Sequence, residues 1–375
     1  METDSFVESA PPEQPGLWSV SPRDGGQRAM PDAFSLDRLC SMLRQQDTDD
    51  MASAGDRLAA LSAAGLDRLP LPGHGATLRR WQALAAVARS DLSLAKLYEG
   101  HTDALAIVGE LDPDNRSTTQ GLWAVWAAEA PGHRTLLSDT LAKNTVLLNG
   151  SKAWCSGAGT VTHALLTTWR ADGDGPQLVQ LQLDQPAVAV SANDWKAVAM
   201  AGSAGLTVFL DQARASRVGA VGSYLHRPGF WHGGAGVAAC WYGGALALAD
   251  ALRCEVQAAG ARNPSPFRLA ALGKVDLAMQ GCAALLRAAA MSIDAAPRDD
   301  ARMVVLRVRQ AAEGCSRFVL DAVGRALGAT PFCQNSRFAR MAVDLPVFIR
   351  QSHAERDFAA LGEQIAAMEE SPWQL

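Results

Sequence analysis

The chain has 375 residues, of which 48% are hydrophobic and 19% are charged, and this composition excludes a disordered chain or a small disulfide scaffold. The 34 Lys and Arg against 39 Asp and Glu give a net charge of -5, and no basic cluster is long enough to follow a phosphate backbone. We therefore expect no nucleic-acid partner. The 7 cysteines include no CxxC pair, so we predict neither a metal site nor disulfides.

The N-terminal segment METDSFVESAPPEQPG is acidic and rich in Pro, whereas a signal peptide begins with a basic end and continues with an apolar stretch. No apolar run reaches the roughly 18 residues of a membrane span without Gly, His or charged residues. We therefore expect a soluble, cytoplasmic enzyme that does not insert into a membrane.

The spacing of apolar residues changes along the chain. Residues 1–33 are rich in Pro and Gly and predict a flexible leader, and residues 34–120 have apolar residues at helical spacing. Residues 121–220 hold alternating and β-branched runs between Gly, Asp and Asn turns, which predicts a β domain. Residues 221–375 hold four long Ala- and Leu-rich helical stretches, which must pack together to cover their apolar faces. The predicted fold class is α+β, with an N-terminal helical domain, a central β-barrel or sandwich and a C-terminal four-helix bundle.

Three segments carry motifs in this same order. They are NGSKAWCSGAG at residues 149–159, the stretch DWKAVAMAGSAGLTVFLDQARASRVGAVGSY at residues 194–224, and AVGRALGATPF at residues 322–332. The first resembles the NGxKxWIT(N/S)G motif of the acyl-CoA dehydrogenase superfamily. The others resemble its W/G-M-x-x-S block with the following strand, and its A-V-Q-x-x-G-G-x-G-F helix and turn. The resemblance covers residues 110 to 360 and implies an acyl-CoA dehydrogenase-like fold with FAD as cofactor.

The first motif predicts one wall of a flavin site. A flavin ring is a flat apolar tricycle with a polar edge, so its pocket needs an aromatic wall and a few hydrogen-bond donors. The resemblance assigns the wall to Trp154 and a hydroxyl near the ring to Ser156, which is two residues on and therefore on the same face of a strand. Periodicity alone favours a core aromatic residue at Trp154 and a turn residue at Ser156, and it is the resemblance that points to the flavin site.

Trp126 and Ala128 lie where relatives have a T-E-P-x-x-G-S-D loop over the flavin. Ala128 replaces the Thr of that loop, so backbone N–H groups must bind part of the flavin edge. The resemblance also places Arg262 and Phe267 in the loop between the first two bundle helices, where relatives bind the cofactor's pyrophosphate from a neighbouring subunit. Gly328 lies at the turn that approaches the adenine. These positions imply a homodimer or homotetramer with most contacts in the bundle, although Arg262 is also compatible with an ordinary solvated loop residue.

Neither usual position of the family's catalytic Glu holds a carboxylate. An ungapped count of eight residues from Asp344 reaches Ser352, and the alternative position lies in the segment FWHGGAG at residues 230–236. His353 and His232 occur at these two places. A neutral His is a competent base at neutral pH, and His101 is a third candidate on the substrate side. Each of the three is also compatible with a helix cap or a surface His.

Three functions follow, in this order. The first is an FAD-dependent oxidoreductase that acts on the CH–CH group of an acyl-CoA or another small organic substrate, with a His in place of Glu and an electron-transfer flavoprotein as partner. The second is a two-component monooxygenase that uses O2 and reduced FMN or FAD from a flavin reductase, because the tail QSHAERD resembles that branch of the superfamily. In that branch a His and a hydroxyl group assist the reaction with oxygen, and the resemblance implies that His353 and Ser156 have these roles. The third is a catalytically silent subunit with a flavin-enzyme fold.

Overall fold

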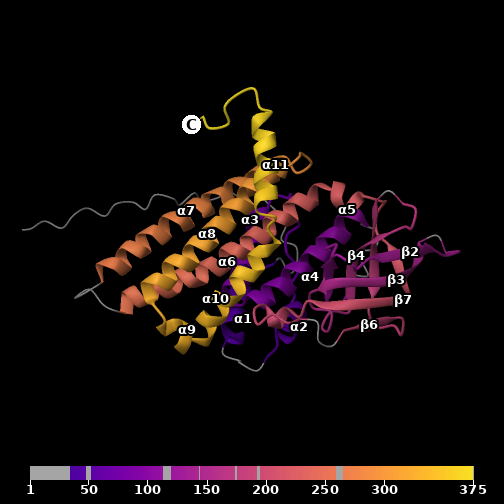
Figure 1. Ribbon diagram of the computed structural model, residues 1–375, viewed down its shortest axis with the longest axis horizontal. Coiled ribbons are helices and arrows are strands. Elements are labelled where there is room, and N and C mark those ends of the chain that lie inside the picture. Colours follow the sequence, from indigo (N-terminus) through magenta and orange to yellow (C-terminus); the bar gives the residue numbers. More distant parts are fainter. Residues whose placement is uncertain are drawn as a thin grey trace, which may run out of the picture. The chain divides into compact units, whose positions relative to one another are not determined.

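The computed structural model describes residues 34–47, 52–112, 120–142, 144–173, 175–191, 195–258 and 265–374. The predicted leader at residues 1–33 lies outside the described residues. Within the described part of the chain, a group of helices comes first, a group of strands follows, and a second group of longer helices ends the chain (Figure 1).

The first four helices are α1 (Leu36–Gln46), α2 (Ala54–Ala63), α3 (Thr77–Ser90) and α4 (Leu92–Leu111). Polar caps set three of their starting points. Ser53 and Asp56 form a capping box at α2, and the Asp91 carboxylate accepts a hydrogen bond from the Leu94 N–H at the start of α4. Because Asp91 both ends α3 and caps α4, the two helices follow each other without a loop.

The strands are β1 (Trp123–Trp126), β2 (Thr135–Asp139), β3 (Thr145–Cys155), β4 (His163–Trp169), β5 (Pro176–Gln182), β6 (Val188–Val190) and β7 (Leu206–Arg217). They form one sheet in the order β1-β4-β2-β3-β7-β5. Because β5 also pairs with β4, the strands from β4 to β5 close on themselves. β6 pairs with β7, and β1 pairs in parallel with β4. Alternate apolar residues such as Val146 and Leu148 of β3 fill the interior.

The later helices are α5 (Ser223–His226), α6 (Pro228–Ala258), α7 (Pro266–Ala295), α8 (Arg302–Leu327), α9 (Thr330–Gln334), α10 (Ser336–Phe348) and α11 (Glu355–Ala366). Two short 3-10 helices are η2 (Ala201–Ser203) and η3 (Ile349–Gln351). Helices α6, α7 and α8 lie side by side, and α6 also packs against α3 and α10 (Figure 1).

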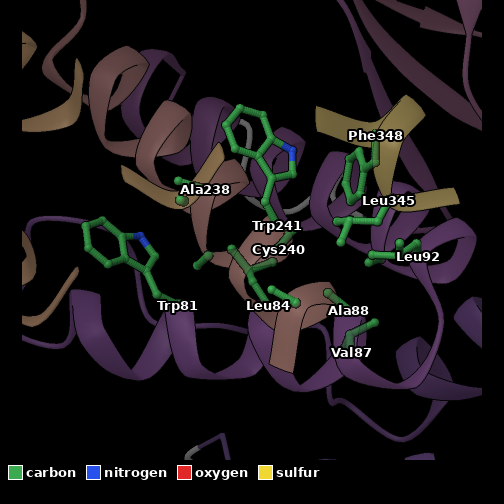
Figure 2. Close-up of a cluster of buried hydrophobic side chains, with 14 of the residues drawn as sticks. Trp81, Leu84, Val87, Ala88, Leu92, Ala238, Cys240, Trp241, Leu345 and Phe348 are labelled. Atoms are coloured by element: carbon green, nitrogen blue, oxygen red, sulfur yellow. The ribbon is translucent and has the colours of Figure 1, made fainter. Parts of the chain in front are cut away.

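The interface between α3 and α6 is the core that holds the two groups of helices together. Trp81 and Leu84 of α3 face Cys240 and Trp241 of α6 in one buried cluster (Figure 2). Gly243 of α6 belongs to the same interface and lies against Ala85 of α3. A Cβ atom at that position would lie 2.3 Å from the backbone oxygen of Ala85 in α3, so the two helices touch backbone to backbone there.

Two helices, α6 and α7, are long and apolar enough to cross a membrane, whereas the sequence predicted no such run. The expectation about apolar runs was wrong, because a helix continues through the Gly, His and isolated charged residues that were counted as interruptions. Within the most apolar window of each helix, 67% of α6 and 28% of α7 is buried in the protein. Core helices of soluble proteins have the same length and composition, so the two helices are weak evidence for a membrane location.

Candidate active site

A cavity of about 760 Å³ lies where the strands meet the helices. Its lining comes from α4, β1, the end of β3, the segment before and within η2, α5, α6, α8 and the segment from residue 347 to 357. Aromatic side chains form much of the wall: Trp126, Trp154, Trp195, Tyr224, Phe230, Trp231 and Phe348. A cavity of this size with aromatic walls and a few polar groups is typical of a site for a small organic molecule.

Lys152 of the NGSKAW motif anchors the strand that carries Trp154. Its side chain is 1% exposed, and its ammonium group donates hydrogen bonds to a Glu129 carboxylate oxygen at 2.8 Å and to the Thr167 hydroxyl at 2.9 Å. The Thr167 hydroxyl also donates to Glu129 at 2.6 Å. The lysine therefore ties β3 to β4 and to the segment after β1, so the two predicted flavin-binding segments are held in one place.

Trp154 turns outward because the strand is irregular there. Its backbone has a φ of 58°, in the left-handed region that non-glycine residues rarely adopt, and the pairing with β7 shifts between Lys152 and Cys155. The indole is consequently 57% exposed and lines the cavity. A bulge at the end of a strand is a common way to redirect a side chain toward a site.

Ser156 also lines the cavity, but it does not lie on the strand as predicted. β3 ends at Cys155, and Ser156 begins the turn that follows, with its N–H donating to the Trp154 carbonyl at 3.0 Å. The side-chain alternation of a regular strand therefore does not relate the two residues. The turn itself is held from both sides, because the Trp126 indole N–H donates to the Ser156 carbonyl at 3.1 Å and the Gly157 N–H donates to the Ser203 carbonyl at 2.8 Å.

Trp126 and Ala128 border the cavity at the end of β1. Trp126 is buried, and its indole N–H is hydrogen-bonded to the Ser156 carbonyl. Its ring is therefore part of the packed wall under the cavity and does not project into it. The backbone N–H of Ala128 donates no hydrogen bond within the described residues. It is therefore available to an acceptor in the cavity.

His353 reaches the cavity from the segment after η3. Its Nδ1 lies 3.4 Å from an Asp357 oxygen, and its side chain is more than half exposed. Asp357 accepts hydrogen bonds from the Gln310 amide at 3.4 Å and from the His353 N–H at 3.3 Å, which fixes the carboxylate beside the imidazole. The preceding residue, Ser352, is buried, and its hydroxyl accepts a hydrogen bond from Gln310 rather than facing the cavity.

His101 and His232 are not lining residues of this cavity. His101 is fully buried between Asp67, whose carboxylate lies 2.9 Å from Nε2, and the Trp123 N–H, which donates to Nδ1 at 3.1 Å. Since Nδ1 accepts, the proton is on Nε2, and the ring links α4 to β1. His232 is buried on another face of α6, and burial lowers its pKa. The residues that α6 presents to the cavity are Phe230, Trp231, Gly233, Gly234 and Val237.

The remaining predicted positions are distant from this cavity or undescribed. Arg262 lies outside the described residues. Phe267, at the start of α7, is 85% exposed, and Gly328 follows the end of α8 with a φ of 68°. These two positions are neighbours in space, because the Arg268 guanidinium donates to the Ala326 carbonyl at 3.3 Å. Neither lines the cavity, so within one chain they do not contribute to it.

Sequence reasoning missed the charged residues of the cavity wall. Lys96, Glu99 and Asp103 recur at intervals of three and four in α4 and therefore share one helical face, but such a pattern is also typical of a solvated surface. Arg227 lies in the turn between α5 and α6, and its guanidinium donates to Glu110 at 2.8 Å. Only the approach of β1 and α6 to α4 shows that these charges face a cavity.

No protein-family model matches the chain, and no curated protein matches it in sequence. Solved structures do match. KijD3 in complex with FMN and dTDP-3-amino-2,3,6-trideoxy-4-keto-3-methyl-D-glucose has a TM-score of 0.73 at 18% identity, over 90% of this chain and 94% of that chain. TdsC from Paenibacillus sp. A11-2 with FMN and indole has a TM-score of 0.74 at 16% identity, over 90% and 98%. Methanesulfinate monooxygenase MsuC from Pseudomonas fluorescens has a TM-score of 0.73 at 17% identity, over 91% and 98%.

The likeness extends over nearly the whole of each compared chain, although sequence identity is low. It shows that this chain has the acyl-CoA dehydrogenase-like fold that the three proteins share. Fold alone does not assign the reaction, which must be argued from the site.

Proposed function

We propose that the protein is a two-component flavin-dependent monooxygenase, which receives reduced FMN or FAD from a separate flavin reductase and uses O2 to oxygenate a small organic substrate. The observation that carries the proposal is the cavity that brings Trp154, Ser156 and His353 together within this fold. Two of the structures with the same fold hold FMN, and two are named monooxygenases, TdsC as a dibenzothiophene monooxygenase.

The residues present fit a flavin ring. Trp154 offers an exposed indole as a wall, the Ala128 N–H is a donor with no partner among the described residues, and Ser156 brings a hydroxyl to the lining of the same cavity. When bound in reduced form, a flavin supplies the electrons with which O2 is activated. In this proposal Trp154 and Trp126 position the ring and exclude water, Ser156 donates a hydrogen bond at its edge, and His353 holds a proton beside the reacting atoms.

The acyl-CoA dehydrogenase function, which the sequence ranked first, becomes the second candidate. It requires a base that faces an acyl chain, and both expected positions, Ser352 and His232, lie outside the cavity lining. His353 remains, and its contact with Asp357 suits either a base or a hydrogen-bond donor. A silent subunit is the third candidate, which the retained Trp154 and Ser156 disfavour.

We further propose that the domain boundaries lie at residues 34–120, 121–220 and 221–375, and that the protein is located in the cytoplasm.

An exposed stripe on α7 supports a homo-oligomer. Its members lie three or four residues apart and are all apolar or small: Ala270, Gly273, Leu277, Gly281, Ala284, Ala288 and Met291. Leu277 is 77% exposed and Met291 is 66% exposed, which is unusual in the middle of a long helix. We propose that a second copy of the chain covers this stripe, in a homodimer or homotetramer. In such an assembly the turn that holds Gly328, together with Arg262 and Phe267, would lie near a neighbouring subunit's flavin.

The decisive experiment measures flavin binding in both redox states and then the reaction of the complex. We expect the protein to bind reduced FMN under anaerobic conditions more tightly than oxidised FMN, and to change the rate at which reduced FMN is reoxidised by O2. Octanoyl-CoA added anaerobically to the protein with FAD should leave the flavin absorbance unchanged. Bleaching by octanoyl-CoA would move the assignment to a dehydrogenase, and failure to bind flavin in either state would favour the silent subunit.

A further inference from the structure

One carboxylate of the cavity lining has neither a hydrogen bond nor an ion pair among the described residues, although the charges of Arg227, Arg80 and Lys96 act on it from a distance. This carboxylate belongs to Asp103 of α4. It lies directly against α6, where a Cβ atom on Gly233 would be 2.9 Å from Oδ1. Burial raises the pKa of Asp103, with the Arg227 guanidinium acting in the opposite direction. An unpartnered carboxylate in such a place is costly unless a ligand satisfies it.

The positively charged residues of the same wall are already engaged within this chain. The Arg309 guanidinium donates to the backbone carbonyls of Gly234 at 2.8 Å and Gln351 at 2.9 Å, and it lies over the Trp241 ring. Three further cations of the lining have acidic partners: Lys96 with Glu99 at 3.1 Å, Arg227 with Glu110 at 2.8 Å, and Arg350 with Glu313 at 3.4 Å. Each of these cationic side chains therefore has at least one direct partner within the chain, although the buried Arg227 Nε has none, whereas no hydrogen bond or ion pair of the described residues reaches Asp103.

The surroundings of Asp103 strengthen its attraction for a cation. Tyr224 of α5 and Phe230 and Trp231 of α6 form a chain of edge-to-face rings, with centroid separations of 5.6 and 5.5 Å, and all three line the cavity. Aromatic walls exclude water, and an ion pair is stronger where water is excluded. Ring faces also attract cations, and two of these rings already have one within the chain: Arg227 lies over Tyr224 at 5.3 Å and Arg302 lies over Trp231 at 5.5 Å.

We propose that Asp103 is the residue that binds the substrate's basic nitrogen, and that the substrate class is an aromatic or otherwise apolar amine bound in its ammonium form. The proposal rests on the proposed function, because it names the substrate class of that same cavity. An ammonium group would donate a charge-assisted hydrogen bond to the Asp103 carboxylate, and the apolar remainder of the molecule would lie against the rings. Gly233 leaves the carboxylate its place, because a Cβ atom there would lie 2.9 Å from Oδ1 and displace it.

Three probes of nearly one shape test the charge preference. Tryptamine, tryptophol and indole-3-propionate share an indole and a two-carbon arm, and end in an ammonium, a hydroxyl and a carboxylate group. Binding is measured by isothermal titration calorimetry at neutral pH, with the full chain free of flavin and again with FMN. We expect tryptamine to bind about 10- to 100-fold more tightly than tryptophol, the range for a hydrogen bond to a charged group.

The Asp103→Asn variant should remove this preference while leaving tryptophol binding within about threefold of the wild-type value, as expected where no charge is involved. Retained tryptophol binding also shows that the variant is folded. Asp357→Asn is the matched control, since it removes a carboxylate from the same cavity near His353, and it should keep the preference for tryptamine. Gly233→Ala is a second variant, expected to weaken tryptamine selectively by displacing the Asp103 carboxylate.

Equal binding of tryptamine and tryptophol by the wild-type protein would overturn the proposal. So would a preference that survives in Asp103→Asn, or tighter binding of indole-3-propionate, which would indicate that Arg309 binds the substrate. These outcomes are separable from failure of the proposed function, because the first titrations contain no flavin. A protein that prefers tryptamine but binds no flavin would retain this inference and lose the monooxygenase assignment.

Discussion

Gly243 is the position at which a single methyl group should do the most damage to the helical core. In a Gly243→Ala variant the new Cβ atom would lie 2.3 Å from the Ala85 oxygen and 2.9 Å from both its carbonyl carbon and its Cα atom. Ordinary contacts begin near 3.4 Å, and the opposing atoms belong to the backbone of α3, which cannot rotate away. The two helices must therefore separate by about 1 Å, a gap that forfeits a quarter to a half of the dispersion energy of the atoms involved.

This separation would loosen the cluster that joins Trp81 and Leu84 to Cys240 and Trp241 (Figure 2). Overpacking of a core costs about 1 to 3 kcal/mol, and a backbone clash belongs at the upper end of that range. The gain from replacing Gly by Ala within a helix offsets about 1 kcal/mol. We expect the free energy of unfolding to fall by about 2 kcal/mol and the thermal midpoint to fall by about 4 °C.

The matched control is Gly314→Ala in α8, where nothing lies within 4 Å of the new Cβ atom. The same chemical change should there raise the free energy of unfolding by up to about 1 kcal/mol, since only the helix preference changes. Both thermal midpoints can be followed by intrinsic Trp fluorescence. Equal shifts for the two variants, or a Gly243→Ala protein as stable as the wild type, would refute the reasoning about the backbone contact between α3 and α6.

Three further predictions concern the site, a buried charge and the assembly. His353→Gln should lower turnover by about 10²- to 10⁴-fold with unchanged flavin affinity, as measured by oxygen uptake, whereas His226→Gln, an exposed His outside the cavity, should leave it unaltered. Burial raises the pKa of Asp344, so the folded protein favours the protonated carboxyl group. The contribution of this group to the free energy of unfolding is therefore complete below the ordinary pKa of Asp and is lost as pH rises through the raised pKa. Asp344→Asn keeps an oxygen for the Met200 N–H and should raise the thermal midpoint at neutral pH, with the gain vanishing below about pH 4; a gain that persists in acid would contradict this. Leu277→Glu should convert the oligomer to monomer in light scattering, because it places a charge in the α7 stripe, and a wild-type monomer would refute that interface.

Local patterns in the sequence were sufficient to order the elements along the described chain. The spacing of apolar residues and the positions of turn residues involve only neighbours a few positions away in the chain. The change from helices to strands near Trp123 and the return to helices at Ser223 can therefore be predicted from the sequence. The NGSKAW motif likewise indicated that Trp154 lies at a site, but it did not indicate how the backbone exposes the indole. The exposed indole depends on a left-handed backbone at the end of β3 and on pairing with β7, which no local pattern specifies.

The tertiary structure alone decided which titratable residues share the cavity. The sequence offered His353 and His232 at the two expected positions of the base, and His101 as a third candidate on the substrate side. Packing separates them, because His101 bonds to Asp67 and Trp123 in the core, α6 turns His232 away, and the chain after η3 brings His353 into the cavity. In the sequence, Asp103 is indistinguishable from a charged residue on the exposed face of a helix. Only the structure shows that Gly233 of α6 lies against it. Whether a side chain meets solvent, the core or a cavity depends on contacts between residues far apart in the chain, and these exist only once the helices and strands have packed.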